Sequence, residues 1–227
     1  MNTTELEELL KDCPTLYHMA QHGSWPSIYE RGLLSTTALL DLYRVGGMSR
    51  ELIESKRRDR SMLLETPELG RVVIRDQFPM NDSGLLRCLP THISPMDWYR
   101  LLNGKVFFWM TKGRLLRLLN AGTYRSETHD VLEISTRELL ERYFEKIWFC
   151  PMNSGCTKPI PHPRDENTFL KIPDYPYSHW RAKRPRGERI VEFAIDHGVP
   201  DIRKYVTRVV EMKNKNELRT IYTAQLQ

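Results

Sequence analysis

The chain has 227 residues, of which 40% are apolar and 28% charged, a composition ordinary for a soluble globular protein with one sizeable core. No apolar run approaches the roughly 18 residues of a membrane-spanning helix, and the polar, acidic N-terminus is unlike a secretory signal, so we expect a cytoplasmic protein with no membrane partner. The four scattered cysteines have no CxxC spacing and indicate neither a disulfide framework nor a zinc site, and the net charge of +5 is modest but unevenly placed.

The periodicity predicts a single α+β domain over residues 1–227, built of short helices and strands. In chain order we expect a helix at 4–11, a strand at 15–19, helices at 26–32, 36–44 and 48–58, a strand at 71–76, a helix opening at Ser94, a strand at 105–110, a helix at 112–120, a strand at 130–134, a helix from Ser135 to about 144, and strands at 146–150, 189–195 and 206–212. Region 151–188 is rich in Pro and Gly and lacks periodicity, which is typical of a functional or disordered loop.

The strand at 189–195 carries one carboxylate in its middle. Alternation places Ile190, Glu192 and Ala194 on one face and a uniformly apolar set on the other, which is predicted to be core. Glu192 is then either a solvated residue of a half-exposed strand or a carboxylate fixed in a cleft. The preceding loop, 175–189, is dense in aromatic and basic residues and favours a cleft for a polyanion with planar groups.

Basic residues are concentrated in segments 50–60 and 181–189. Such clusters attract phosphate backbones in a salt-dependent way, although a solvated helix face is an equal alternative for the first segment. In the second segment the basic residues are interleaved with aromatic side chains on which bases could stack. The predicted contacts to a nucleic-acid substrate are Tyr177, Trp180, Lys183 and Arg184.

Three segments in order carry a resemblance to a known superfamily. The first, 16–35, is a strand ending in His18, a helix carrying Ile28, and then Gly-Leu-Leu-Ser; the second is Val-Phe-Phe-Trp at 106–109; the third is 189–200, with Glu192 followed by Val-Pro. Together they resemble the three motifs of ADP-ribosyltransferases, especially bacterial DarT-type toxins, and of the RNA 2′-phosphotransferases that share their fold. The resemblance implies split antiparallel sheets with flanking helices.

The resemblance further implies that NAD is the co-substrate, that no metal is required, and that Glu192 is the catalytic residue. Cleavage of the nicotinamide–ribose bond develops oxocarbenium character on the ribose. Hydrogen bonds to a sugar 2-OH can strengthen in such a transition state. A carboxylate on a rigid strand could therefore accept the ribose 2′-OH while stabilising the growing positive charge.

By the same resemblance, His18 would bind the adenosine ribose or the adjacent phosphate, and Tyr17 or the aromatic strand would pack against the nicotinamide. The candidates on that strand are Phe107, Phe108 and Trp109. At least one of these three belongs to the core, because adjacent strand residues point in opposite directions. For His18 the alternative is a core histidine at the end of a strand.

The NAD pyrophosphate needs a cationic partner. Arg75, at the end of an apolar strand, is the first candidate, and a salt bridge with Asp76 or another surface carboxylate is its alternative. Arg164, in the long loop, is the second candidate.

The chain also departs from the superfamily pattern. The second motif usually supplies a Tyr, which is absent from 106–109. Ile190 stands where arginine-modifying transferases usually carry a second acid, which argues against an arginine acceptor. His129, His162 and His179 are all candidates for the histidine that DarT-type enzymes carry in their middle region.

These features predict an NAD-dependent mono-ADP-ribosyltransferase that modifies DNA or RNA, acting as a toxin or phage-defence effector. An antitoxin protein would be a partner of such a toxin. Two alternatives remain: an RNA 2′-phosphotransferase-like enzyme, and a catalytically inactive nucleic-acid-binding module of the same fold.

Overall fold

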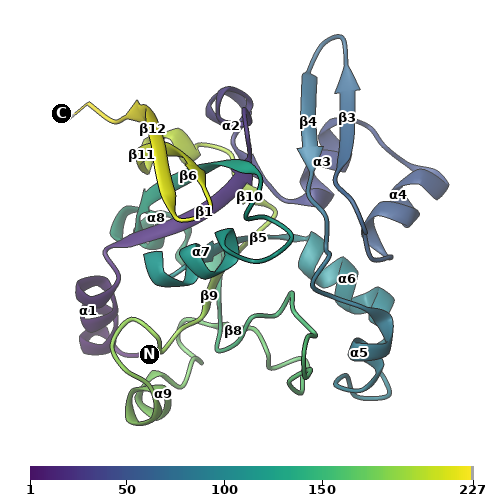
Figure 1. The fold of residues 1–227 in the computed structure, drawn as a ribbon. Helices are drawn as coiled ribbons and strands as arrows, with labels where there is room; N and C mark the ends of the chain where they lie inside the picture. Colours follow the sequence, from purple (N-terminus) through teal and green to yellow (C-terminus); the bar gives the residue numbers. More distant parts are fainter. Residues whose placement is uncertain (226–227) are drawn as a thin grey trace.

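The structure, a computed structural model, describes residues 1–225 (Figure 1). Its α-helices are α1 (Thr3–Asp12), α2 (Trp25–Arg31), α3 (Thr36–Leu42), α4 (Gly47–Glu54), α5 (Asp82–Leu86), α6 (Pro95–Asn103), α7 (Lys112–Leu119), α8 (Thr136–Tyr143) and α9 (Tyr177–Lys183). Its strands are β1 (Thr15–Gln21), β2 (Leu33–Leu34), β3 (Met62–Thr66), β4 (Gly70–Ile74), β5 (Lys105–Trp109), β6 (Thr128–Ser135), β7 (Ile147–Cys150), β8 (Leu170–Lys171), β9 (Glu192–Asp196), β10 (Gly198–Val199), β11 (Val206–Lys213) and β12 (Asn216–Thr223).

The main sheet has eight strands in the order β12-β11-β6-β1-β5-β9-β7-β8, and every neighbouring pair is antiparallel. Its two halves, β12-β11-β6-β1 and β5-β9-β7-β8, meet between β1 and β5. That junction has a single register pair, Tyr17 with Trp109, whereas β1 and β6 pair over seven residues. The mixed α and β order with antiparallel strands is confirmed, and the sheet is narrowly joined at its middle.

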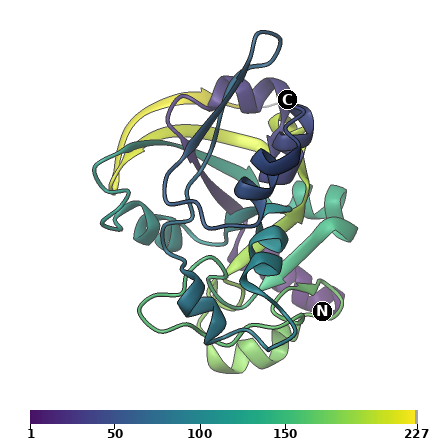
Figure 2. The same ribbon diagram turned by 90° about the vertical axis from the view of Figure 1, so that its right-hand side faces the viewer.

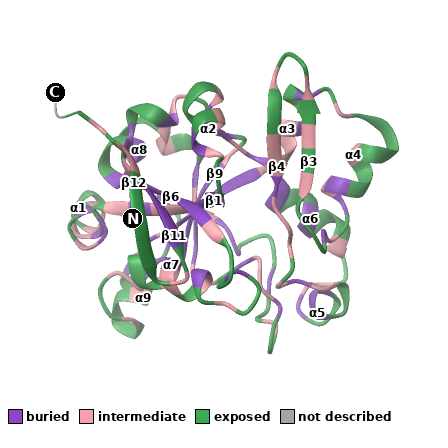
Figure 3. Ribbon diagram, turned by 45° about the horizontal axis from the view of Figure 1, so that its top comes forward, coloured by how far each residue is buried: buried purple, intermediate pink, exposed green. Residues whose placement is uncertain are grey.

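The core lies on both faces of this sheet. On one face, the sheet packs against residues of α1, α2, α8 and α9, including Leu9 and Leu139. On the other face, one cluster contains residues of α5 and α6, and another contains Leu115 and Leu119 of α7. Figure 3 shows the buried residues gathered on the central strands and the exposed ones on the outer helices and the hairpin.

The hairpin of β3 and β4 stands out from the sheet together with α3 and α4 (Figures 1 and 2). A small core of Leu40, Ile53 and Ile74 joins these four elements. The turn between the two strands ends at Gly70, whose φ of 66° lies in the left-handed region that suits glycine. This unit stands beside β1 and forms one wall of a cavity described below.

Most sequence-predicted elements are confirmed, with several exceptions. The helix predicted at 48–58 ends at Glu54. Region 151–188 is not structureless, because it contains β8 and α9. Strand β12 escaped prediction because it is an edge strand whose residues are mostly exposed, so it shows no apolar alternation. The short α5 and the strands β2, β3 and β10 were also missed.

Strand β9 begins at Glu192 rather than at residue 189, and this corrects the predicted faces. Ile190 lies before the strand and packs in the same core cluster as Phe193, not beside Glu192. Ala194 does share the face of Glu192, as predicted, and packs in the cluster of α5 and α6. Within residues 1–225, none of the helices combines the length and apolar character that crossing a bilayer requires.

Candidate functional site

A row of four cross-strand partners runs across the middle of the sheet. Tyr17 pairs with Trp109, Trp109 with Glu192, and Glu192 with Cys150. Directly opposed residues of neighbouring strands place their side chains on the same face. The sheet register therefore brings three sequence-predicted residues, Tyr17, Trp109 and Glu192, onto one face, and it adds Cys150, which the sequence did not single out.

Glu192 lies in a cavity of about 290 Å³, which we call the Glu192 cavity. Its side chain is almost fully buried, with the residue 4% exposed. The backbone N–H of Ser154 donates to both carboxylate oxygens, at 3.2 Å each. Burial raises the pKa of Glu192 to about 7, although the hydrogen bonds from Ser154 and Cys150 and the charge of Arg164 oppose the rise. The carboxylate is therefore held in one orientation and gains a proton close to neutral pH.

A second cavity, of about 410 Å³, lies between β1, the α2–α3 segment and β4, and we call it the hairpin cavity. The two cavities adjoin, because they share six lining residues: His18, Met19, Thr36, Arg75, Lys105 and Phe107. Cavities of this size are typical of small-molecule sites. Together they form an elongated site with the Glu192 carboxylate at one end.

His18 lies where the two cavities adjoin. Its Nδ1 donates to the carbonyl oxygen of Phe107 at 2.8 Å, since a carbonyl can only accept. Burial lowers the pKa of His18 to about 4, and the nearby charge of Arg75 acts in the same direction. The imidazole is therefore neutral, and its Nε2 carries the lone pair and can accept a hydrogen bond from a ligand hydroxyl.

Arg75 follows β4 and lines both cavities. Its guanidinium lies over the ring of Tyr124 at 4.9 Å, and Nη1 is 3.5 Å from Nδ1 of His129. Within residues 1–225 its partners are thus a ring and an imidazole, and no carboxylate pairs with it. Asp76 instead accepts from the Tyr124 hydroxyl at 2.8 Å, and the Arg58 Nε holds the carbonyl of Arg75 at 2.9 Å. The cation is oriented but not neutralised.

The aromatic strand β5 divides its rings between the two faces of the sheet. Phe107, Phe108 and Trp109 all contribute atoms to the lining of the Glu192 cavity, but their rings pack differently. Phe108 is 1% exposed and packs edge-on against Phe193 in the core, with ring centroids 5.9 Å apart. Phe108 is therefore the core residue that strand alternation predicts among the three rings, and Phe107 and Trp109 are the candidates that remain for the nicotinamide contact.

Arg164 is not available as a cation for a pyrophosphate. Its residue is 2% exposed, and its guanidinium donates to the backbone carbonyls of Asn153, Cys156 and His162. These bonds fix the loop beside Glu192, so the candidacy of Arg164 as a pyrophosphate ligand is wrong.

The loop at 175–189 is less open than predicted. Tyr177 is 1% exposed, and its hydroxyl accepts from Nη1 of Arg189 at 2.9 Å, so the prediction that it stacks on a base is wrong. Trp180 is partly buried, and the Arg184 guanidinium lies over its ring at 4.0 Å. Lys183 is exposed. The loop therefore presents only part of the predicted stacking surface.

Trp180 and Arg184 instead belong to a third cavity, of about 1130 Å³, which we call the basic groove. Its charged lining residues are Arg114, Arg117, Lys158, Arg184 and Glu188. The single carboxylate pairs with the two arginines of α7, which leaves an excess of positive charge. Asn153 lines both this groove and the Glu192 cavity. The sequence did not single out the arginines of α7, because the sequence of an amphipathic helix does not show which other segments lie next to its polar face.

In the other basic segment, 50–60, two of the arginines are not available to a polyanion. Arg50 pairs with Asp41 and Glu54, and Arg58 is buried, which lowers its pKa to about 10. Lys56 and Arg60 are exposed, so for these residues a phosphate-binding patch and a solvated face both remain open.

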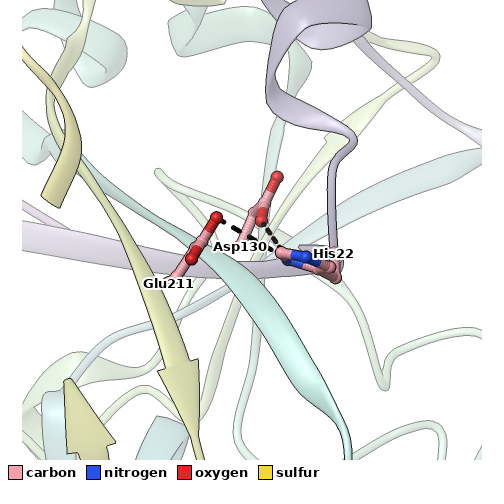
Figure 4. A group of neighbouring side chains, drawn as sticks. All are labelled: His22, Asp130 and Glu211. Atoms are coloured by element: carbon pink, nitrogen blue, oxygen red, sulfur yellow. Dashed lines mark ion pairs between the residues drawn. The ribbon is translucent and has the colours of Figure 1, made fainter. Parts of the chain in front are cut away.

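Figure 4 shows a further cluster of His22, Asp130 and Glu211. The His22 Nδ1 lies 3.4 Å from Asp130 and 3.9 Å from Glu211. Asp130 already accepts from the backbone N–H groups of Gly23 and Trp25, and Glu211 accepts from Arg219 through both oxygens. The cluster thus fixes the turn between β1 and α2.

Residues 14–206 match the sequence model of a family of unknown function, DUF7002. The chain belongs to this family. None of the curated proteins matches the chain. In this member of the family, the matched segment contains every residue that lines the Glu192 cavity, the hairpin cavity and the basic groove, whereas α1 and β12 lie outside it.

Proposed function

We propose that the protein is an NAD-dependent mono-ADP-ribosyltransferase that modifies nucleic acid. The observation that carries the proposal is the buried, doubly hydrogen-bonded carboxylate of Glu192 at the end of an elongated site. The same site is lined by two aromatic rings, a neutral imidazole and an arginine that has no carboxylate partner among residues 1–225. These groups match the parts of a dinucleotide: a planar base, hydroxyls and a pyrophosphate.

In the proposed complex, the nicotinamide packs against Phe107 and Trp109, and Arg75 pairs with the pyrophosphate. The adenosine occupies the hairpin cavity, with a ribose hydroxyl donating to His18. The resemblance of the sequence to ADP-ribosyltransferases supports this orientation, as does the narrow junction between β1 and β5.

The proposed reaction needs a carboxylate and no metal. The bond between ribose C1′ and the nicotinamide nitrogen breaks, and the nicotinamide leaves with the bonding electron pair. The Glu192 carboxylate accepts a hydrogen bond from the ribose 2′-OH and stabilises the positive charge that develops on the ribose. A nucleophilic atom of the acceptor then bonds to C1′ and loses its proton. The ionised carboxylate is the active form, so the rate of cleavage should rise as the pH increases through about 7.

The basic groove is the proposed path of the acceptor. Its excess of positive charge suits a phosphate backbone, and Trp180 at its wall suits an unpaired base. Asn153 connects the groove with the Glu192 cavity, so an acceptor in the groove lies next to the reacting ribose. An enzyme of this kind would act as a toxin or phage-defence effector, and an antitoxin would be its partner.

The cluster of cations in the groove also favours a second candidate, an RNA 2′-phosphotransferase, which would hold a splice-junction phosphate there. Incubation with labelled NAD and single-stranded DNA, RNA, 2′-phosphorylated RNA and protein separates the candidates. Label on the nucleic acid supports the proposal. Loss of the 2′-phosphate supports the second candidate, and salt-sensitive binding without NAD turnover supports an inactive binding module. Label on protein alone would contradict the nucleic-acid acceptor.

His18→Ala is expected to raise the KM for NAD about tenfold while lowering kcat less, because the contact exists in both the ground and the transition state. Steady-state kinetics of NAD cleavage measure both values. His92→Ala is the control, since that imidazole is exposed and lines none of the three cavities. A loss of thermal stability with an unchanged KM would place His18 in the core instead.

The double variant Arg117→Gln/Lys158→Gln is expected to bind single-stranded nucleic acid more weakly. The magnitude of the slope of log K against log salt should fall by about 1.4, roughly 0.7 for each cation removed, since fewer counterions are released. The charge-matched control is Lys183→Gln/Arg186→Gln, whose residues lie on the exposed loop outside the groove. Equal effects of the two pairs would mean that the loop, and not the groove, binds the acceptor.

A further inference from the structure

The carboxylate of Glu192 owes its orientation to a loop from another part of the chain. The Ser154 N–H donates to both of its oxygens, and Ser154 itself is 1% exposed. Ser154 lies in a segment without regular secondary structure between β7 and β8. The position of this N–H therefore depends on what holds the loop.

One side of the loop is held by Arg164. Its guanidinium donates to the carbonyl of Asn153 at 3.4 Å, to that of Cys156, and to that of His162 at 2.8 Å. It also donates to the sulfur of Cys88 at 3.1 Å. Asn153 and Cys156 bracket Ser154, so Arg164 fixes the backbone on both sides of the N–H that Glu192 uses.

The other side of the loop is held by the segment before α5. The Thr157 N–H donates to the carbonyl of Pro79 at 3.2 Å, and the Asn81 N–H donates to the Thr157 hydroxyl at 3.1 Å. The loop is therefore anchored by segments other than β9, the strand that carries Glu192.

Arg164 is also unusual in its charge. A buried guanidinium is costly unless acceptors or a counter-charge compensate it. Within residues 1–225, no carboxylate forms an ion pair with Arg164, and its acceptors are neutral. The charge of Arg164 favours the ionised form of Glu192 and lowers its pKa, although by less than the hydrogen bonds from Ser154 do.

We propose that Arg164 is a positioning residue for Glu192: it fixes the 153–156 loop so that the Ser154 N–H orients the carboxylate, and it supplies a buried positive charge beside that carboxylate. The inference that Arg164 affects catalysis rests on the proposed function, whereas the inference that Arg164 orients the Glu192 carboxylate does not.

Several other groups face the carboxylate or share its cavity, and they stay unchanged in the test. Cys150 faces Glu192 from β7. The remaining titratable or charged groups that line the cavity are His18, Arg58, Arg75, Asp76, Lys105 and Tyr124. Removal of Arg164 alone should therefore raise the pH at which Glu192 ionises, because an opposite charge favours the charged form.

The test compares two variants. Arg164→Met removes the hydrogen-bond donors and the positive charge, whereas Arg164→Lys keeps the charge but loses the planar guanidinium with its several donors. For Arg164→Met, the acid limb of the kcat profile for NAD cleavage should move to higher pH. The plateau of that profile should fall tenfold or more, with little change in KM. Arg164→Lys should restore the position of the limb but not the plateau. Arg87→Met, an exposed residue that lines none of the three cavities, is the control.

A second measurement needs neither NAD nor turnover. Titration of ¹³C-labelled glutamate carboxylates by NMR identifies Glu192 as the resonance that Glu192→Gln removes. In the folded Arg164→Met protein this resonance should titrate at higher pH than in the wild type. An unchanged titration in a folded variant would overturn the proposal, as would a kcat profile that keeps its shape and height. If the wild type cleaves no NAD, the proposed function fails, and the NMR titration still decides the role of Arg164.

Discussion

Replacing Glu192 with glutamine is expected to lower the rate of NAD cleavage by two or more orders of magnitude, about 3 kcal/mol of transition-state stabilisation. The amide keeps the shape of the side chain, but it carries no charge to oppose the developing oxocarbenium. The affinity for NAD should change little, because the nicotinamide and the pyrophosphate have other contacts. Single-turnover cleavage and equilibrium NAD binding measure the two quantities separately. Near-normal cleavage by this variant would exclude Glu192 as the catalytic residue.

The same variant should behave differently in stability. The folded pKa of Glu192, about 7, lies above its ordinary value of 4.5. Its contribution to stability is therefore fully present below pH 4.5, declines as the pH rises to about 7, and stays constant above that. The difference between the two pKa values corresponds to a loss of about 3 kcal/mol in the free energy of unfolding at alkaline pH. Glu192→Gln should accordingly unfold at a higher denaturant concentration than the wild type at pH 8, with a smaller difference at pH 5. A less stable variant at pH 8 would mean that the Ser154 hydrogen bonds outweigh the cost of burial.

Replacing Arg75 with glutamine is expected to raise the KM for NAD by about 10- to 100-fold, because a charge-assisted pair with the pyrophosphate contributes about 1.5–3 kcal/mol. The change should leave kcat within a few-fold, since the pyrophosphate does not react. The KM of Arg75→Lys should lie between those of the wild type and Arg75→Gln, because lysine keeps the charge but lacks the planar guanidinium.

The control for Arg75→Gln is Arg60→Gln, an exposed arginine of the same part of the chain that lines none of the three cavities. Isothermal titration with NAD on a catalytically inactive Glu192→Gln background would measure affinity without turnover. An unchanged affinity in Arg75→Gln would show that the cation serves another purpose, such as holding Tyr124 and His129 in place.

Local signals explain which parts of the fold could be predicted. The Ser94 cap followed by Pro95 predicted α6, and in the structure the Ser94 N–H also donates to the Asp97 carboxylate, which completes a capping box. Ser135 likewise caps α8 by accepting from the Glu138 N–H. These signals act within a few residues and need no tertiary context. The strand character of 105–109 is equally local, but the choice of facing ring depends on the register with β9.

The site itself depends on contacts between distant segments, which explains the errors. Tyr177 lies in a sequence rich in aromatic and basic residues, yet it is buried because its hydroxyl meets Arg189 against the core. Arg75 and Arg164 were both candidate cations for the pyrophosphate, and only the fold shows that Arg164 holds a loop while Arg75 lines both cavities. His129 is another example, since it lies beside Arg75 although 54 residues separate them.

The single register pair between Tyr17 and Trp109 gives the protein two strand edges that face each other in its interior. Edges normally lie at the periphery of a sheet, where charges or covering segments keep them from pairing with other chains. Here a ligand in the space between β1 and β5 would meet peptide N–H and C=O groups, one of which, the carbonyl of Phe107, already holds His18. Every residue except proline supplies the same two backbone groups, so part of the recognition would survive extensive replacement of side chains. A binding site of this kind places only weak constraints on the amino-acid sequence.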